Sequence, residues 1–67
     1  MIEITVNGEK RQLPQQSTVA SLLDTLGLAG KRIAVERNGE IVPRSRHADE
    51  TIAGGDRLEI VVAVGGG

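Results

Sequence analysis

The residues of this chain with the clearest chemical potential stand at its C-terminal end, where Gly65, Gly66 and Gly67 follow an apolar run. Three glycines can extend roughly 10 Å, at about 3.3–3.6 Å per residue, through a channel too narrow for side chains. They would present the carboxylate of Gly67 inside another protein. Such a carboxylate reacts only after activation, for example as an acyl-adenylate. This pattern indicates a reacting carboxylate on a thin tail, although terminal glycines are also typical of a frayed chain end.

Other candidate groups have simpler explanations. His47 is the only histidine and stands near Asp49 and Glu50, a grouping that could serve as a metal corner or a general base. Zinc needs three or four protein ligands, and no second histidine or cysteine exists to complete such a set. We therefore expect no metal site, no catalytic residue and a solvated loop around His47. The chain is expected to act as a protein co-substrate and not as an enzyme.

Composition excludes several classes of function. The chain has 67 residues, no cysteine and no aromatic residue, with nine acidic and eight basic side chains for a net charge of -1. It cannot form a disulfide, and it has no platform on which bases of single-stranded nucleic acid could stack. The balanced charge predicts no nucleic-acid or membrane partner. No apolar run approaches the roughly 20 residues of a membrane span, so we expect a cytoplasmic protein.

Two hairpins, one helix and a final strand are predicted along the chain. Apolar residues alternate before the Asn-Gly turns of residues 2–13 and 33–42, and a weaker, polar strand follows the first turn, which is typical of hairpins. Residues 18–27 have a capping threonine, an apolar stripe at helical spacing and a closing glycine. Residues 57–64 form the most apolar strand. We expect a folded domain over residues 1–64 and a flexible tail over 65–67.

This order of elements predicts an α+β fold with a mixed sheet of about five strands packed on one helix. It resembles the ubiquitin-like β-grasp, in which the first and last strands lie side by side in the middle of the sheet. If alternate residues of the last strand face the helix, Val61 and Ala63 point outward. An exposed apolar pair beside the tail is a candidate docking site, although ordinary strand propensity explains it equally well. Arg44 is a further candidate, for an acidic partner.

Three segments together resemble the ThiS-type sulfur carriers of thiamine biosynthesis. They are Asn-Gly-Glu-Ile-Val-Pro-Arg at residues 38–44, Gly-Asp-Arg-Leu-Glu-Ile-Val at 55–61 and Ala-Val-Gly-Gly-Gly at 63–67. The resemblance covers essentially the whole chain. It implies that an E1-like adenylating enzyme of the ThiF type uses ATP and Mg to adenylate Gly67. Gly66 and Gly67 match the family's terminal pair, and Gly65 extends the reach of the tail.

The resemblance also implies the fate of the activated carboxylate. A sulfur donor such as a cysteine desulfurase supplies the sulfur that converts the adenylate to a thiocarboxylate. A thiazole synthase of the ThiG type then takes this sulfur to build the thiazole. ATP and Mg belong to the activating enzyme, so this chain is expected to bind no cofactor.

Other functions fit the same tail. The small subunit of molybdopterin synthase and other β-grasp sulfur carriers end in the same glycine pair but serve different acceptors. A ubiquitin-like tag would use the same activation to form an isopeptide bond with a lysine. A passive binding module would use no tail chemistry. One residue added after Gly67 would separate this passive module from the others.

Overall fold

The structure is a computed structural model and describes residues 1–63. Val64, Gly65, Gly66 and Gly67, which include the expected end of the last strand and the whole tail, lie outside the described residues. The elements are β1 (Ile2–Val6), β2 (Glu9–Leu13), α1 (Val19–Thr25), β3 (Ile33–Arg37), β4 (Glu40–Val42), the short 3₁₀ turn η1 (Arg44–Arg46) and β5 (Arg57–Val62). Each predicted element is present.

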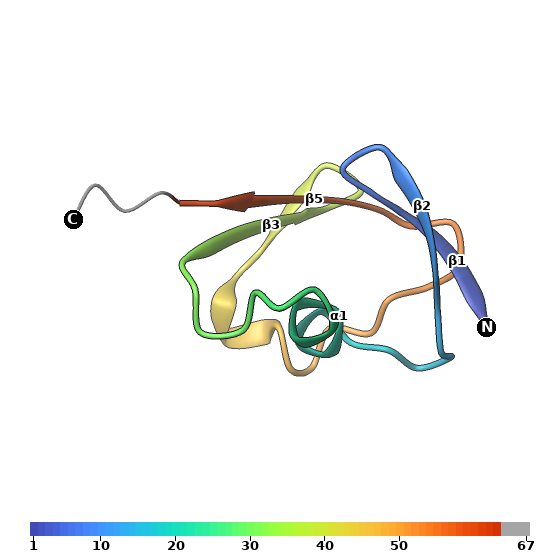
Figure 1. The fold of residues 1–67 in the computed structure, drawn as a ribbon, viewed down its shortest axis with the longest axis horizontal. Helices are drawn as coiled ribbons and strands as arrows, with labels where there is room; N and C mark the ends of the chain where they lie inside the picture. Colours follow the sequence, from blue (N-terminus) through green and yellow to red (C-terminus); the bar gives the residue numbers. More distant parts are fainter. Residues whose placement is uncertain (64–67) are drawn as a thin grey trace.

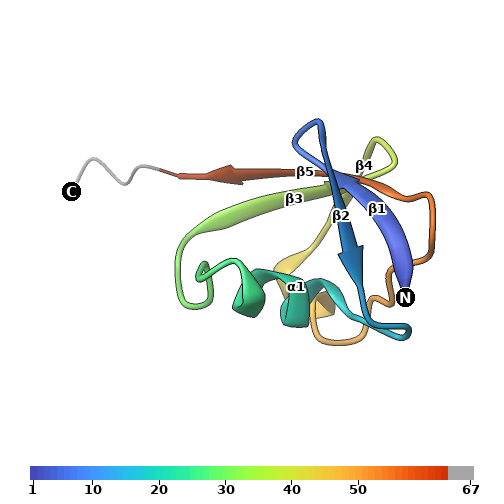
Figure 2. The same ribbon diagram turned by 45° about the vertical axis from the view of Figure 1, so that its right-hand side comes forward.

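The five strands form one mixed sheet in the order β2-β1-β5-β3-β4. β1 and β5 are parallel neighbours at the centre, and the remaining pairs are antiparallel. α1 covers one face of this sheet, and the other face carries no helix (Figures 1 and 2). The predicted β-grasp arrangement, with the first and last strands side by side, is confirmed.

Two Asn-Gly turns set the hairpins. Asn7 and Gly8 have φ angles of 50° and 84°, and Asn38 and Gly39 have 53° and 84°. Positive φ at both central positions gives a turn whose twist matches the flanking strands, and asparagine and glycine adopt it at little cost. The two turns thus close β1 on β2 and β3 on β4.

α1 is only seven residues long and depends on its cap and its packing. Thr18 and Ser21 form a capping box, each side chain accepting a hydrogen bond from the other's backbone N–H. Gly27, with a φ of 74°, ends the helix. A helix this short is not stable alone, so burial against the sheet must stabilise it.

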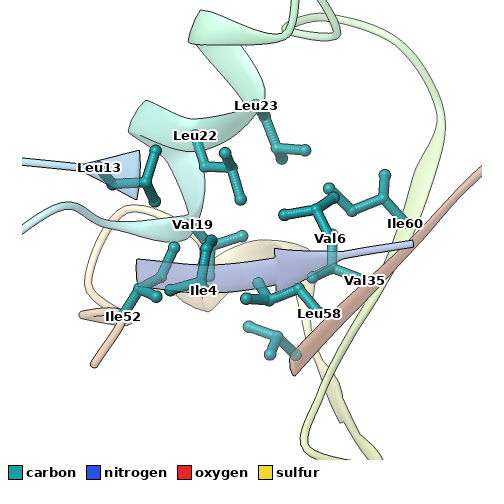
Figure 3. Packing of buried hydrophobic residues seen from close by; sticks show 11 residues of the cluster. Ile4, Val6, Leu13, Val19, Leu22, Leu23, Val35, Ile52, Leu58 and Ile60 are labelled. Atoms are coloured by element: carbon teal, nitrogen blue, oxygen red, sulfur yellow. The ribbon is translucent and has the colours of Figure 1, made fainter. Parts of the chain in front are cut away.

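The core between α1 and the sheet is wholly aliphatic (Figure 3). Its buried members are Ile4, Val6, Leu13, Val19, Leu22, Leu23, Val35, Val42, Ile52, Leu58 and Ile60. The predicted inward residues of β5, Leu58 and Ile60, are among them. Leu26, Leu28 and Ile33 are partly buried at its margin.

The expectation of a solvated His47 is wrong. Only 8% of the residue is exposed, and its Nε2 lies 3.0 Å from the carbonyl oxygen of Val42. Because a carbonyl only accepts hydrogen bonds, Nε2 carries a hydrogen and is the donor in this hydrogen bond. Backbone bonds within and after η1 fold this polar segment back, and the N–H of Ala20 in α1 donates to the His47 carbonyl at 2.9 Å. His47 is a structural residue in this fold.

Candidate functional site

β5 is the strand that precedes the C-terminal glycines in the sequence, and its two halves differ in the strands with which they are paired. Along β3 it is paired from Leu58, opposite Arg37, to Val62, opposite Ile33. Along β1 it is paired only at Arg57 and Leu58. The first half of β5 therefore has a partner strand on both sides, whereas the second half has one on the β3 side alone.

A side chain replaces the missing β1 pairing at one position. The Asn7 amide donates from Nδ2 to the carbonyl of Ile60 at 3.1 Å, and its Oδ1 accepts from the Ile60 N–H at 2.8 Å. Asn7 lies just after β1 and so extends the ladder by one residue. The asparagine of the first turn is thus also hydrogen-bonded to β5 near the C-terminal end of that strand.

The second turn is hydrogen-bonded to the start of β5. Oδ1 of Asn38 accepts from the N–H of Arg57 at 2.9 Å, and Nδ2 donates to Oδ1 of Asp56 at 3.1 Å. Asp56 is 7% exposed and also accepts bonds from Nε of Arg37 at 2.7 Å and from the N–H of Ala53 at 2.8 Å. This network ties the β3–β4 turn to the loop before β5.

Ionisation in this network favours the charged forms. Burial acts to raise the pKa of Asp56, but the hydrogen bonds from Ala53, Asn38 and Arg37, with the Arg37 charge, outweigh it and lower the pKa below its usual value. The bond to Asp56, with a second ion pair to Glu50 at 2.9 Å, raises the pKa of Arg37 despite burial. The start of β5 is therefore anchored by an ion pair between Arg37 and Asp56.

Beyond Ile60, β5 has an open backbone edge on the β1 side. Ala63 donates its N–H to the Arg32 carbonyl at 2.9 Å, so odd-numbered residues of β5 direct their N–H and C=O groups toward β3. Val62 directs its own groups the opposite way, where β1 has already ended at Val6. An extended segment of another protein can pair with this edge.

The sheet face without a helix carries the exposed apolar residues beside this edge. Val61 is 61% exposed and lies opposite Ala34 on β3, and Ile41 on β4 is 74% exposed. Ala63 is exposed as well and follows Val61 with the same alternation. The outward direction predicted for Val61 is therefore observed; that the pair docks a partner stays a prediction.

Two carboxylates lie in the next row of the same face. Glu59 and Glu36 are directly opposite one another on β5 and β3, and neither forms an ion pair within residues 1–63. Like charges in this position destabilise a sheet, and exposed valine and isoleucine add no core. Stability does not explain this face, which we call the open sheet face: Ala34, Glu36, Ile41, Glu59, Val61 and Ala63.

Arg44 is not brought together with Val61 and Ala63. It lies in η1 and lines a hollow on the opposite, helix-covered side of the sheet, together with Leu23 and Ile33. The three predicted docking residues therefore belong to two surfaces. Among residues 1–63 no cluster of three potential metal ligands occurs, and no helix is long and apolar enough to cross a membrane.

Asn7, Asn38 and Asp56 position β5, and none of them was predicted from the sequence to do so. Both asparagines were assigned only to turns. The available signal was that asparagine, not aspartate, precedes glycine in both turns, because only an amide can both donate to and accept from a neighbouring strand.

Comparison with known proteins identifies the chain. The model of the ThiS family matches residues 2–67. The chain belongs to the ThiS family. A crystal structure of the thiamine biosynthesis protein ThiS from Geobacter metallireducens superposes with a TM-score of 0.83 at 32% identity, covering 98% of this chain and all of that one.

Curated relatives of this ThiS family member fall into two kinds. A thiazole synthase of Paramagnetospirillum magneticum is 46% identical over 66 residues, which are 98% of this chain but only 20% of that protein. The chain thus spans about a fifth of the length of this relative. An uncharacterized protein of Porphyra purpurea, ycf40, is 33% identical and is covered to 93% of its length. A related stretch thus makes up most of a short protein in one case and a fifth of a thiazole synthase in the other.

Proposed function

We propose that this chain is a sulfur carrier of thiamine biosynthesis and that its reacting group is the carboxylate of Gly67. The match to the ThiS family up to residue 67 carries this function, because it includes the terminal glycines as well as the fold. The chain supplies a substrate group and not a catalytic one. It is a protein co-substrate, with residues 1–64 as the folded domain and 65–67 as the tail.

The chemistry on the tail consists of activation followed by sulfur transfer. An E1-like enzyme of the ThiF type joins the Gly67 carboxylate to the AMP part of ATP, releasing pyrophosphate. A sulfur nucleophile then attacks the Gly67 carbonyl carbon and expels AMP. Sulfide gives the thiocarboxylate directly. A persulfide gives an acyl disulfide. A thiol then attacks the outer sulfur of this acyl disulfide, breaks the S–S bond and releases the thiocarboxylate, while the thiol and the outer sulfur form a mixed disulfide.

The described residues support this function by presenting the tail. Asn7 and β3 fix β5 up to its C-terminal end, while the Val62 edge and the open sheet face remain available to a partner. An enzyme that binds both surfaces can guide residues 65–67 into its active site. Most of the recognition energy then comes from the folded domain, because glycines offer no side chains.

The partners and cofactors follow from the same chemistry. The acceptor is a thiazole synthase of the ThiG type, a class supported by the thiazole synthases that contain a related stretch. The sulfur donor is a protein such as a cysteine desulfurase. ATP and Mg are bound by the activating enzyme, this chain holds no cofactor, and the reactions take place in the cytoplasm.

Intact mass spectrometry of the protein purified from its native host tests this function. We expect a fraction in which one sulfur replaces one oxygen, on a chain that ends at Gly67, and no such fraction after deletion of Gly67. Only unmodified mass, even after incubation with ATP, the adenylating enzyme and sulfide, would contradict it. A covalent conjugate on a lysine would instead identify a tag, and sulfur transfer to a pterin precursor would identify a molybdopterin synthase subunit.

A further inference from the structure

A second surface near the end of β5 is a hollow on the helix side of the sheet. It lies between α1, the α1–β3 connection and the segment that begins with η1, and it has an open volume of about 290 Å³. Leu23, Leu28 and Ile33 give it an apolar lining. A large apolar side chain from another protein fits such a space.

The charge around this hollow is one-sided. Lys31 and Arg44 line it and are exposed, and neither forms an ion pair within the described part of the chain. No aspartate or glutamate lines it, whereas four other hollows of the described chain each include at least one glutamate. The hollow is therefore complementary to an acidic segment that carries an apolar side chain.

The hollow lies next to the end of β5 but away from the open sheet face. Ile33 in its lining is the residue opposite Val62, and the carbonyl of Arg32 binds the Ala63 N–H. Val61 points to the other side of the sheet, which α1 does not cover (Figure 2). Two proteins can thus contact this end of the molecule at once, one on each side.

The chemistry on Gly67 requires such a simultaneous contact. An acyl-adenylate hydrolyses in water and has to remain in the closed active site until sulfur arrives. The sulfur nucleophile must therefore reach the Gly67 carbonyl while the activating enzyme still holds the tail and the open sheet face. A protein that delivers sulfur has only the remaining surfaces of this chain to recognise.

We propose that the hollow lined by Leu23, Leu28, Ile33, Lys31 and Arg44 docks the sulfur-donor protein through an acidic segment with an apolar side chain. This docking rests on the proposed function and adds the surface through which the donor recognises the carrier. It assigns Arg44 to the donor, and Val61 and Ala63 to the activating enzyme.

The test compares a protein donor with a donor that needs no docking. Thiocarboxylate formation is measured with the adenylating enzyme and ATP, using either the host's cysteine desulfurase with cysteine or saturating inorganic sulfide. We expect Lys31→Glu/Arg44→Glu to slow the desulfurase-driven rate by about tenfold or more, as for loss of a central binding contact. The sulfide-driven rate should be unchanged.

Two further variants separate charge, shape and general effects. Lys10→Glu/Arg46→Glu reverses the same amount of charge at two exposed residues that neither line the hollow nor belong to the open sheet face, and it should leave both rates unchanged. Ala29→Trp fills the hollow without changing charge and should slow the desulfurase-driven rate alone. Equal rates for all variants with the desulfurase, or an equal loss with sulfide, would overturn the docking site. Absence of thiocarboxylate from wild-type protein even with sulfide would instead overturn the proposed function.

Discussion

At the scale of single residues, Asn7 and Asn38 each form a turn and also donate or accept side-chain hydrogen bonds that hold β5. Asn7→Gly keeps the positive φ of the first turn but removes both amide bonds to Ile60. We expect a loss of about 1–2 kcal/mol in the free energy of unfolding and about tenfold faster hydrogen exchange at the Ile60 amide. Hydrogen exchange by NMR measures both local and global opening.

Asn38→Gly is the matched control, because it adds the same glycine to the second turn. It removes the bond to the Arg57 N–H and should accelerate exchange at Arg57 but not selectively at Ile60. If both variants accelerated exchange at the Ile60 and Arg57 amides equally, the acceleration would reflect glycine flexibility. Separate stabilisation of the two ends of β5 by the two asparagines would then be disproved.

Asp56 gives a residue-scale prediction about pH. Its pKa is lower in the folded chain than the ordinary 3.8, so its charge stabilises the fold above that pH, and this contribution is lost as the pH falls through the folded pKa. Asp56→Asn should lower the free energy of unfolding by about 2 kcal/mol at pH 7, with the difference shrinking in acid. Urea unfolding between pH 7 and pH 2 measures this.

Asp24→Asn provides the comparison for Asp56. Asp24 is exposed on α1 and forms no ion pair within residues 1–63, so its removal should change stability little at any pH. A difference between wild type and Asp56→Asn that stays constant from pH 7 to pH 2 would show that lost packing, and not lost charge, causes the destabilisation.

At the scale of elements, the strands, helix and turns were predictable because their signals are local. Asn-Gly pairs, alternating apolar residues and the Thr18 cap each act within a few positions, and the structure has all of them. The buried His47 was not predictable. Its burial depends on η1 folding back toward α1, a contact between segments more than 20 residues apart in the case of Ala20 and His47.

The candidate site shows the same division. The outward direction of Val61 follows from alternation along β5, whereas the position of Arg44 depends on where η1 packs. The roles of Asn7 and Asp56 depend on contacts with Ile60 and Arg37, which only the assembled sheet brings close. Residue types therefore indicated the groups on each strand but not which of them share a surface.

The open sheet face gives the element-scale prediction. Val61→Asp should weaken binding to the adenylating enzyme by about tenfold or more, because it replaces an apolar contact of the open sheet face with a third negative charge near Glu36 and Glu59. The free energy of unfolding should fall by no more than about 1 kcal/mol, since Val61 is exposed and only strand propensity and repulsion from Glu59 are affected. Calorimetric titration and urea unfolding measure the two quantities.

Gln12→Asp is the control for the open sheet face. Gln12 is exposed on β2, an edge strand that β1 separates from β5, so the added charge is the same but it lies outside the residues that define the open sheet face. Equal affinities for Val61→Asp and wild type, or equal weakening by both variants, would show that the enzyme binds elsewhere.

At the scale of the whole molecule, the proposed function assigns recognition to the folded domain and reaction to the carboxylate of Gly67. The described domain has a small aliphatic core, a central strand held by side-chain hydrogen bonds, the open sheet face and the hollow on the helix side. Residues 1–63 contain no cluster of potential metal ligands. Its part in the proposed chemistry is to be recognised while other proteins supply ATP, metal and sulfur. Such a division predicts that tail and domain can be disabled independently.

One alanine added after Gly67 tests this separation. It leaves every described residue unchanged but replaces the reacting carboxylate with a peptide carbonyl, which cannot attack ATP to form an acyl-adenylate. ATP–pyrophosphate exchange by the adenylating enzyme should fall to background, while the free energy of unfolding and the weakening caused by Val61→Asp should both persist. Val61→Asp with an unmodified tail should show the converse, with exchange restored at high carrier concentration. Full exchange by the extended chain would mean that activation does not require the carboxylate of Gly67, and the reacting group proposed here would be wrong.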